Sequence, residues 1–362
     1  MLPSIQVLGV RAFHKTESLK HAVEEALLSL GVKLDLELIT GLEAMVDAKI
    51  TAIPALVIDG HVLVQGEVPS KPEILEIVRG ALKSKVVVPI DFSESSRYAL
   101  QYAEDLAEAF FLRVKVLHVY PQSAIPPDSL LNNSALDWLD ELHEGMRSFI
   151  KPQTPRFNAR MEKLSVSTAY EIRPGKVEPE LRRESRSPET RLIVMANSGD
   201  HDIGNRWFGS TAVKVARQAD CPVLLVPPEF RFKGFRRITV ATDKDNVSDF
   251  HRKWLAGLCQ PDKGIIHYVH IRPLKITGVS MLETEGEIVN GIFKEPAESV
   301  EEGLLHFSKK MDSDLIVLIS RHRNAWQELF HKSCTQNLAQ KCPIPILVVP
   351  PSPDSESTTD QD

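Results

Sequence analysis

KVVVPIDFSESSRYAL, at residues 85–100, is the stretch of sequence that decides the fold. Its apolar start predicts a short buried strand, and an acidic turn then leads into a helix opened by Ser93. A similar run, RRITVATDKDNVSDF, lies at 236–250. In that run Asp243 stands at the position that Asp91 has in the first. This recurrence indicates that the chain contains two copies of one structural unit.

Later segments extend the alignment of the two copies. They pair VLHV (116–119) with YVHI (268–271), LIVM (192–195) with LIVL (315–318), and Cys221-Pro222 with Cys342-Pro343. VLHV and YVHI are separated by as many residues as Asp91 and Asp243. The number of residues between LIVM and LIVL is smaller, and the number between the two Cys-Pro dipeptides is slightly smaller still. This predicts that the second copy is clearly shorter between its second and fourth strands, and slightly shorter after the fourth strand. Length changes confined to connections are typical of a duplicated fold.

Strands and helices alternate along each copy. The strands are short continuous apolar runs, which is typical of a parallel sheet covered by helices on both faces. The alternation implies right-handed crossovers and a doubly wound, Rossmann-like α/β sheet in each copy. We expect the last strands, PVLLVPP and PILVVPP, to pair edge to edge, so that the two copies form an internal pseudo-dimer.

The segment 1–83 fits neither copy. It predicts a strand, an amphipathic helix ending at Gly31, a second strand, a hairpin that turns at Asp59-Gly60 and a closing helix. Short spacers separate this small domain from the first copy and the first copy from the second. The predicted limits are 1–83 for the small domain, 85–228 for the first copy, 235–350 for the second copy and 351–362 for a polar, acidic, disordered tail.

The composition bears on location and general partners. The chain has 43 Lys and Arg against 49 Asp and Glu, a net charge of −6, which argues against a general affinity for nucleic acid or anionic membranes. Its first residues lack a basic start with an apolar run, and no later apolar run reaches about 18 residues. We therefore expect neither export nor membrane insertion, and a cytoplasmic location. The 4 cysteines make no CxxC pair, so we expect reduced thiols.

Residues suited to a ligand site gather at one predicted edge of the first copy. In a doubly wound sheet, ligands bind beyond the carboxyl ends of the strands, where the strand order reverses. PIDFS (89–93), HVY (118–120) and the loop after LIVM reach this edge. The loop carries the small residues Ala196, Gly199, Gly209, Ser210 and Thr211. Glycine lets backbone amides approach a phosphate closely, and a helix N-terminus supplies free N–H groups.

At this point the sequence resembles the universal stress protein family. Family members that bind ATP carry Gly-x2-Gly-x9-Gly-Ser/Thr after the fourth strand, and this chain has Ala196-x2-Gly199-x9-Gly209-Ser210. The first strand, VVVPIDFSES, is also similar to the family pattern. The resemblance covers residues 85–228 closely and 236–350 more weakly. It implies an adenine-nucleotide alpha hydrolase-like fold.

The resemblance further implies a site for ATP or AMP, with magnesium, in the first copy. Asp91 and the backbone near Val119 would face the adenine. The residues near the rest of the nucleotide would be Pro89, Gly175, Gly199, Gly209, Ser210 and Thr211. Ala196 in place of the first glycine, and Ala212 where relatives often keep a second hydroxyl, count against ATP. The alternative is that the glycines only shape a turn and that Asp91 caps the following helix.

The corresponding loop of the second copy has no glycine. It contains SRHRNAWQELFHKS at residues 320–333, and His331 replaces Gly209. A phosphate cradle built from backbone amides cannot form there in the usual way. We therefore expect the second copy to be structural.

The segment 1–83 resembles small thioredoxin-like proteins. In LGVRAFHKTESLKHAV the redox pair would fall at Ala12 and Lys15, and both thiols are absent. Thiol–disulfide exchange needs an attacking thiolate, so this domain is expected to be redox-inactive. The resemblance also predicts a cis peptide bond at Ile53-Pro54.

No GxSxG elbow, HExxH helix or Walker loop occurs in the chain. The leading hypothesis is a non-enzymatic stress-response or regulatory protein in which nucleotide occupancy of the first copy is a signal. A second hypothesis is slow ATP hydrolysis at the same site. A third is an interaction scaffold without nucleotide, in which the thioredoxin-like domain docks an unidentified protein partner. The internal pair is compatible with a monomer or a homodimer.

Overall fold

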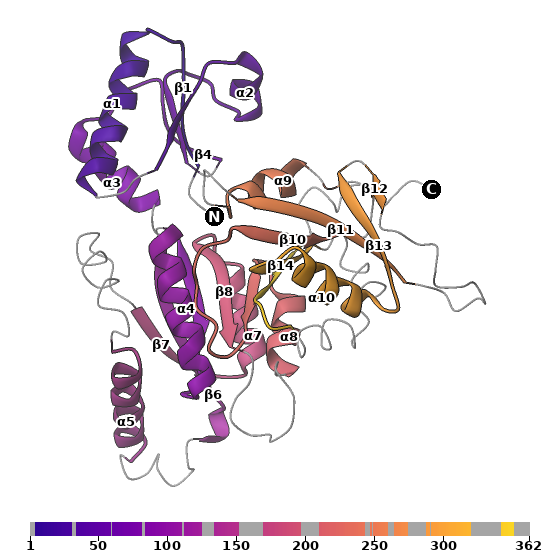
Figure 1. The fold of residues 1–362 in the computed structure, drawn as a ribbon. Helices are drawn as coiled ribbons and strands as arrows, with labels where there is room; N and C mark the ends of the chain where they lie inside the picture. The colour runs from indigo at the N-terminus through magenta and orange to yellow at the C-terminus, as the bar shows by residue number, and fades with distance from the viewer. Residues whose placement is uncertain are drawn as a thin grey trace, which may run out of the picture. The chain divides into compact units, whose positions relative to one another are not determined.

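The computed structural model divides into two compact units (Figure 1). The first is centred on residues 1–84, and the second contains most of the remaining chain. The structure describes residues 4–30, 34–58, 60–81, 84–110, 112–124, 134–151, 169–196, 210–242, 247, 249–259, 264–273, 287–289, 291–319 and 342–350.

The first unit contains a four-stranded mixed sheet in the order β2-β1-β3-β4. Its elements are β1 (Ile5–Leu8), α1 (His14–Ser29), β2 (Leu36–Ile39), α2 (Leu42–Asp47), β3 (Ala55–Ile58), β4 (His61–Gln65) and α3 (Lys71–Ala81). β1 is parallel to β2 and antiparallel to β3. Leu19 and Val23 of α1 pack with Ile74 and Val78 of α3 in one apolar core. This is the thioredoxin-like arrangement expected from the sequence.

Several local predictions for this unit are confirmed. β3 and β4 form the expected hairpin, in which Gly60 has a φ of +77° that favours glycine. The Ile53-Pro54 peptide bond is cis. α1 ends at Ser29, while Gly31 and Asp59 lie outside the described residues. The short helix α2 was not predicted.

In the described part of the second unit, an 11-stranded sheet runs through both copies. The first copy contributes β5 (Lys85–Pro89), α4 (Glu94–Phe110), β6 (Arg113–Tyr120), η1 (Gln122–Ala124), α5 (Ser134–Phe149), β7 (Ala169–Pro174), α7 (Val177–Ser185), β8 (Thr190–Ala196), α8 (Ser210–Gln218) and β9 (Val223–Val226). The second contributes β10 (Arg237–Ala241), α9 (Asp249–Ala256), β11 (Ile265–Pro273), β12 (Glu287–Val289), β13 (Ile292–Ala297), α10 (Val300–Lys310), β14 (Leu315–Ile319) and β15 (Ile346–Val349).

The strand order is β12-β13-β11-β10-β14-β15-β9-β8-β5-β6-β7. In the first copy the chain moves outward from β5 to β6 and β7, then returns to the other side of β5 for β8 and β9. The second copy follows the same path from β10 to β11 and β13 and back to β14 and β15, and it adds β12, antiparallel to β13, at the outer edge. Because right-handed crossovers in opposite directions place their helices on opposite faces, each half is doubly wound. On one face, Leu181 of α7, Val213 of α8 and Phe307 of α10 share a continuous core with strand residues of both copies.

The two copies meet at an antiparallel pair of strands, β9 and β15. Val223 pairs with Val348, and every residue of both strands is buried. Pairing the apolar last strands removes the two edges that the copies would otherwise expose. The predicted edge-to-edge internal pair is therefore confirmed.

Matching hydrogen bonds fix the structural alignment of the copies. Nδ1 of His118 lies 2.8 Å from the carbonyl oxygen of Ile90, and Nδ1 of His270 lies 3.0 Å from that of Thr242. Since a carbonyl only accepts, Nδ1 carries the proton in both histidines. The predicted correspondence of the first two strands, with His270 at the position of His118, is thus confirmed.

One detail of the sequence alignment is wrong. The amide of Ile193 donates to Pro222, and that of Ile316 donates to Pro345, so the fifth strands correspond with the same spacing as the fourth strands. The loops between the fourth and fifth strands therefore have equal length. The repeated Cys-Pro dipeptide misled the alignment, because Cys342-Pro343 lies farther from β15 than Cys221-Pro222 lies from β9.

Candidate functional site

The carboxyl edge of the first copy is the candidate site, because the strand order reverses there between β5 and β8. Of the predicted residues, Pro89 ends β5, Val119 lies near the end of β6, and Ala196 ends β8. Gly175 directly follows β7, and Thr211 lies in the first turn of α8. The fold therefore brings these five positions to one edge of the sheet. Gly199, Gly209 and the side chain of Ser210 lie outside the described residues.

Asp91 holds the turn that leads from β5 into α4. Its Oδ1 accepts a hydrogen bond of 3.0 Å from the amide of Ser93, and Oγ of Ser93 accepts one of 3.1 Å from the amide of Ser96. Neighbouring protein atoms keep part of the solvent away from the Asp91 carboxyl and oppose its charged form, but the hydrogen bonds from Ser93 and Ser96 outweigh this effect and lower its pKa. Ser93 is thus the N-cap, and Asp91 supports the turn while its side chain stays exposed.

An aromatic cluster lies beside this turn. Phe92 has a φ of 64°, and its ring centroid lies 4.7 Å from that of His118 and 5.7 Å from that of Phe149. The guanidinium of Arg97 lies 4.3 Å from the centroid of the Phe149 ring. These contacts attach the end of α5 to the site. The sequence pattern did not indicate them, because Phe92 and Phe149 belong to separate elements.

Gly175 joins the ends of two strands at the same edge. Its amide donates a hydrogen bond of 2.8 Å to the carbonyl of Tyr120, and its φ is +150°. A β-carbon at Gly175 would lie 3.4 Å from Cγ and 3.6 Å from Oε1 of Glu180. The turn thus lies against the Glu180 side chain at ordinary contact distance, and the positive φ is what favours glycine at position 175.

Ala196 and Ala212 are the two departures from the family motif. Ala196 is half-buried at the end of β8, whereas Ala212 is only 3% exposed and belongs to the core between α8 and the sheet. Core packing accounts for a methyl group at position 212. The neighbouring Thr211 is half-buried.

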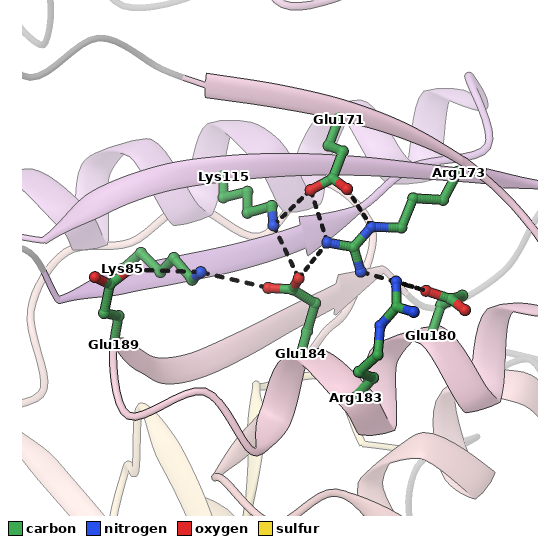
Figure 2. Close-up of polar contacts among 8 residues, drawn as sticks. All are labelled: Lys85, Lys115, Glu171, Arg173, Glu180, Arg183, Glu184 and Glu189. Carbon is green, nitrogen blue, oxygen red and sulfur yellow. Dashed lines mark hydrogen bonds and ion pairs between the residues drawn. The ribbon is translucent and has the colours of Figure 1, made fainter.

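An ionic network lies between β5–β7 and α7 (Figure 2). It comprises Lys85, Lys115, Glu171, Arg173, Glu180, Arg183, Glu184 and Glu189. Glu184 is central: its Oε1 lies 2.8 Å from Nζ of Lys115 and 2.5 Å from Nη2 of Arg173. The side chain of Glu184 is only 7% exposed, so these charges are paired largely away from water. No sequence pattern predicted this network.

Charge pairing shifts the titration of the network. Hydrogen bonding to Arg173 and Lys115 outweighs desolvation and lowers the pKa of Glu171 to about 2. Despite its burial, Glu184 also has a lowered pKa, because Lys115 and Arg173 stabilise its charged form. The same contacts raise the pKa of Arg173. All three groups are charged near neutral pH.

In the second copy an aromatic cluster stands in place of the centre of the network. By strand register and helix position, His267, Phe293 and Phe307 correspond to Lys115, Glu171 and Glu184. The centroids of Phe293 and Phe307 lie 5.2 Å apart, and that of His267 lies 5.9 Å from Phe293. The corresponding positions are therefore filled by ion-paired side chains in the first copy and by aromatic rings in the second.

The carboxyl edge of the second copy also contains a hollow. It is lined by Ala241, Thr242, Val269, Ile271, Val300, Leu304 and Ile319. Among the described residues of this lining, Thr242 alone has a polar atom in its side chain. Residues 320–333, for which we predicted no phosphate cradle, lie outside the described residues.

The described cysteines are unsuited to nucleophilic chemistry. Burial raises the pKa of Cys221 and of Cys342 to about 12, and it also raises that of Cys259. These thiols therefore stay protonated near neutral pH. Cys221 and Cys342 are small residues of the apolar core that the two copies share.

Two kinds of feature are absent from the part of the chain that the structure describes. Within it, no helix combines the length and the apolar character needed to cross a membrane. Within it, too, no three His, Cys, Asp or Glu residues gather closely enough to hold a metal ion.

Comparison with known proteins identifies relatives for both units. A model of the universal stress protein family matches residues 83–227 and 281–350, together more than half of the chain. A model of the thioredoxin domain matches residues 4–79.

Individual relatives agree with these matches. Universal stress protein MJ0531 of Methanocaldococcus jannaschii is 28% identical over 147 residues, covering 40% of this chain and 82% of the relative. A thioredoxin of Methanothermobacter thermautotrophicus is 32% identical over 74 residues, covering 20% of this chain and 95% of the relative. The crystal structure of a universal stress protein from Archaeoglobus fulgidus has a TM-score of 0.54 at 16% identity, covering 74% of this chain and 98% of its own. At that identity it supports the fold alone.

Proposed function

Because this chain belongs to the universal stress protein family and carries a thioredoxin-family domain at residues 4–79, we propose that it is a stress-response protein whose first stress-protein copy binds ATP or AMP. Binding acts as a signal and no reaction cycle is needed. The second copy is structural and completes the shared sheet.

One observation carries the proposal: the exposed Asp91, the Val119 backbone and Gly175 share the carboxyl edge of a sheet whose strand order reverses between β5 and β8. A carboxylate accepts from an amino group of a base, and the side-chain-free Gly175 lets a ligand approach the backbone. The first turn of α8, with Thr211, offers N–H groups to a phosphate. Magnesium would accompany ATP by neutralising part of its phosphate charge.

The remaining assignments belong to the same proposal. Its segments are a thioredoxin-like domain at 1–83, the nucleotide-binding copy at 85–228, the structural copy at 235–350 and a tail at 351–362. The protein is cytoplasmic and has no nucleic-acid partner. The thioredoxin-like domain, without thiols at positions 12 and 15, serves as a docking surface for a protein partner.

Calorimetric titration of the intact chain with ATP and with AMP, with and without magnesium, tests the proposal. We expect saturable binding in the wild type and its loss in Gly209→Val, because a branched side chain would occupy the position where the motif brings backbone amides to a phosphate. No heat and no thermal shift at about millimolar nucleotide would favour the scaffold hypothesis. Phosphate release that disappears in both Gly209→Val and Asp91→Ala would favour slow hydrolysis instead.

A further inference from the structure

Glu180 is the charged side chain that lies against the Gly175 turn. Its Oε2 is shared by two guanidinium groups: Nη2 of Arg183 at 2.7 Å and Nη1 of Arg173 at 3.3 Å. A β-carbon at Gly175 would lie 3.6 Å from its Oε1, so this oxygen is the one nearer to the turn. One oxygen of the carboxylate therefore binds the two arginines, and the other faces the turn.

The two arginines do not contribute equally to neutralising Glu180. Arg173 also binds Glu171 and Glu184, so its charge is divided among three carboxylates. Arg183 binds Glu180 through a shorter contact, from a side chain that is 65% exposed. Removing Arg183 would therefore leave much of the negative charge of Glu180 uncompensated next to Gly175.

We propose that Arg183 and Arg173 neutralise Glu180 so that a phosphate-bearing ligand is tolerated at the Gly175 turn. The balance of these three charges then sets how strongly the first copy prefers ligands with more phosphate groups. This inference rests on the proposed nucleotide site. It adds specificity-determining residues: Glu180 lies against the turn, and Arg183 and Arg173 act through their ion pairs with it. Because these residues act through charge, their effect must grow with the charge of the ligand.

Affinities of the intact chain for adenosine, AMP and ATP, measured at one fixed ionic strength without magnesium, test the inference. In Arg183→Gln we expect the ratio of ATP affinity to adenosine affinity to fall about ten-fold, the size expected for partly screened charges near a surface. In Glu180→Gln, which keeps the shape of the side chain, the ratio should rise. The double variant should return close to the wild-type ratio.

Arg186→Gln is the matched control. Arg186 follows α7, is 61% exposed and binds Asp220 at 3.0 Å, away from Gly175. Its replacement should leave the ratio unchanged. Equal losses for adenosine and ATP in Arg183→Gln would show that the arginine acts on structure only, and an unchanged ratio in both single variants would also overturn the inference. A wild-type protein that binds none of the three ligands would instead contradict the proposed function itself.

Discussion

At the scale of single residues, Phe92 combines an unfavourable backbone with favourable side-chain contacts. Its φ of 64° lies in the left-handed region, which residues with a β-carbon rarely adopt. Its ring packs against His118 and Phe149. The contacts of the ring thus offset the strain of the turn that carries Asp91 to the sheet edge.

Replacement of Phe92 by alanine and by glycine separates these effects. Phe92→Ala should lower the free energy of unfolding by about 2 kcal/mol, because it removes the ring and keeps the strained φ. Phe92→Gly should be about 1 kcal/mol more stable than Phe92→Ala, because glycine adopts this φ without strain. Urea unfolding of both variants measures the difference. If Phe92→Ala were instead more stable than Phe92→Gly, as is usual for these two residues, the left-handed conformation of residue 92 would be contradicted.

Two glutamates of the ionic network, Glu171 and Glu184, should make the stability of the protein depend on pH in the acid range. Glu171 and Glu184 have folded-state pKa values below their ordinary value, so their stabilising effect is complete above about pH 5 and is lost as the pH falls through the lowered values. Glu184→Gln should destabilise the protein by about 2 kcal/mol at pH 7. It should also lose less stability than the wild type between pH 5 and pH 2. Unfolding free energies across this range provide the test, and parallel curves for the two proteins would refute it.

At the scale of elements, the aromatic cluster of the second copy shows which side chains could replace the ionic network of the first. Glu184→Phe alone should cost about 3 kcal/mol, because it leaves Lys115 and Arg173 without a largely buried partner. The triple variant Lys115→His, Glu171→Phe, Glu184→Phe copies the cluster of the second half, and Arg173 keeps Glu180. We expect it to be more stable than Glu184→Phe. A triple variant at least as unstable as the single one would show that the clusters are not interchangeable.

Elements were more predictable from the sequence than their side-chain contacts. Continuous apolar runs and turns are local signals, and they located β5, β9 and β15 and the hairpin of the first unit. The ionic network was missed because it depends on which faces of β6 and β7 lie toward α7, and no local pattern specifies this for distant strands. The candidate edge was predictable because carboxyl ends of parallel strands lie together.

At the scale of the whole molecule, the β9–β15 pair joins the copies into one sheet. A charge placed in this pair should therefore weaken both copies. Val348→Asp would bury a carboxylate opposite Val223, and we expect amide exchange to accelerate in β8 of the first copy as well as in β14 of the second. Hydrogen exchange followed by mass spectrometry measures both. Acceleration confined to the second copy would contradict a shared cooperative unit.

We propose that one copy of the duplicated fold binds adenine nucleotide and that the other does not. The most direct test is titration of ATP into the wild type and into the matched variants Asp91→Ala and Asp243→Ala, with thermal unfolding as a check on folding. We predict one site per chain, unchanged in Asp243→Ala and lost in Asp91→Ala. Binding that survives in Asp91→Ala and disappears in Asp243→Ala, or two equivalent sites in the wild type, would contradict the claim.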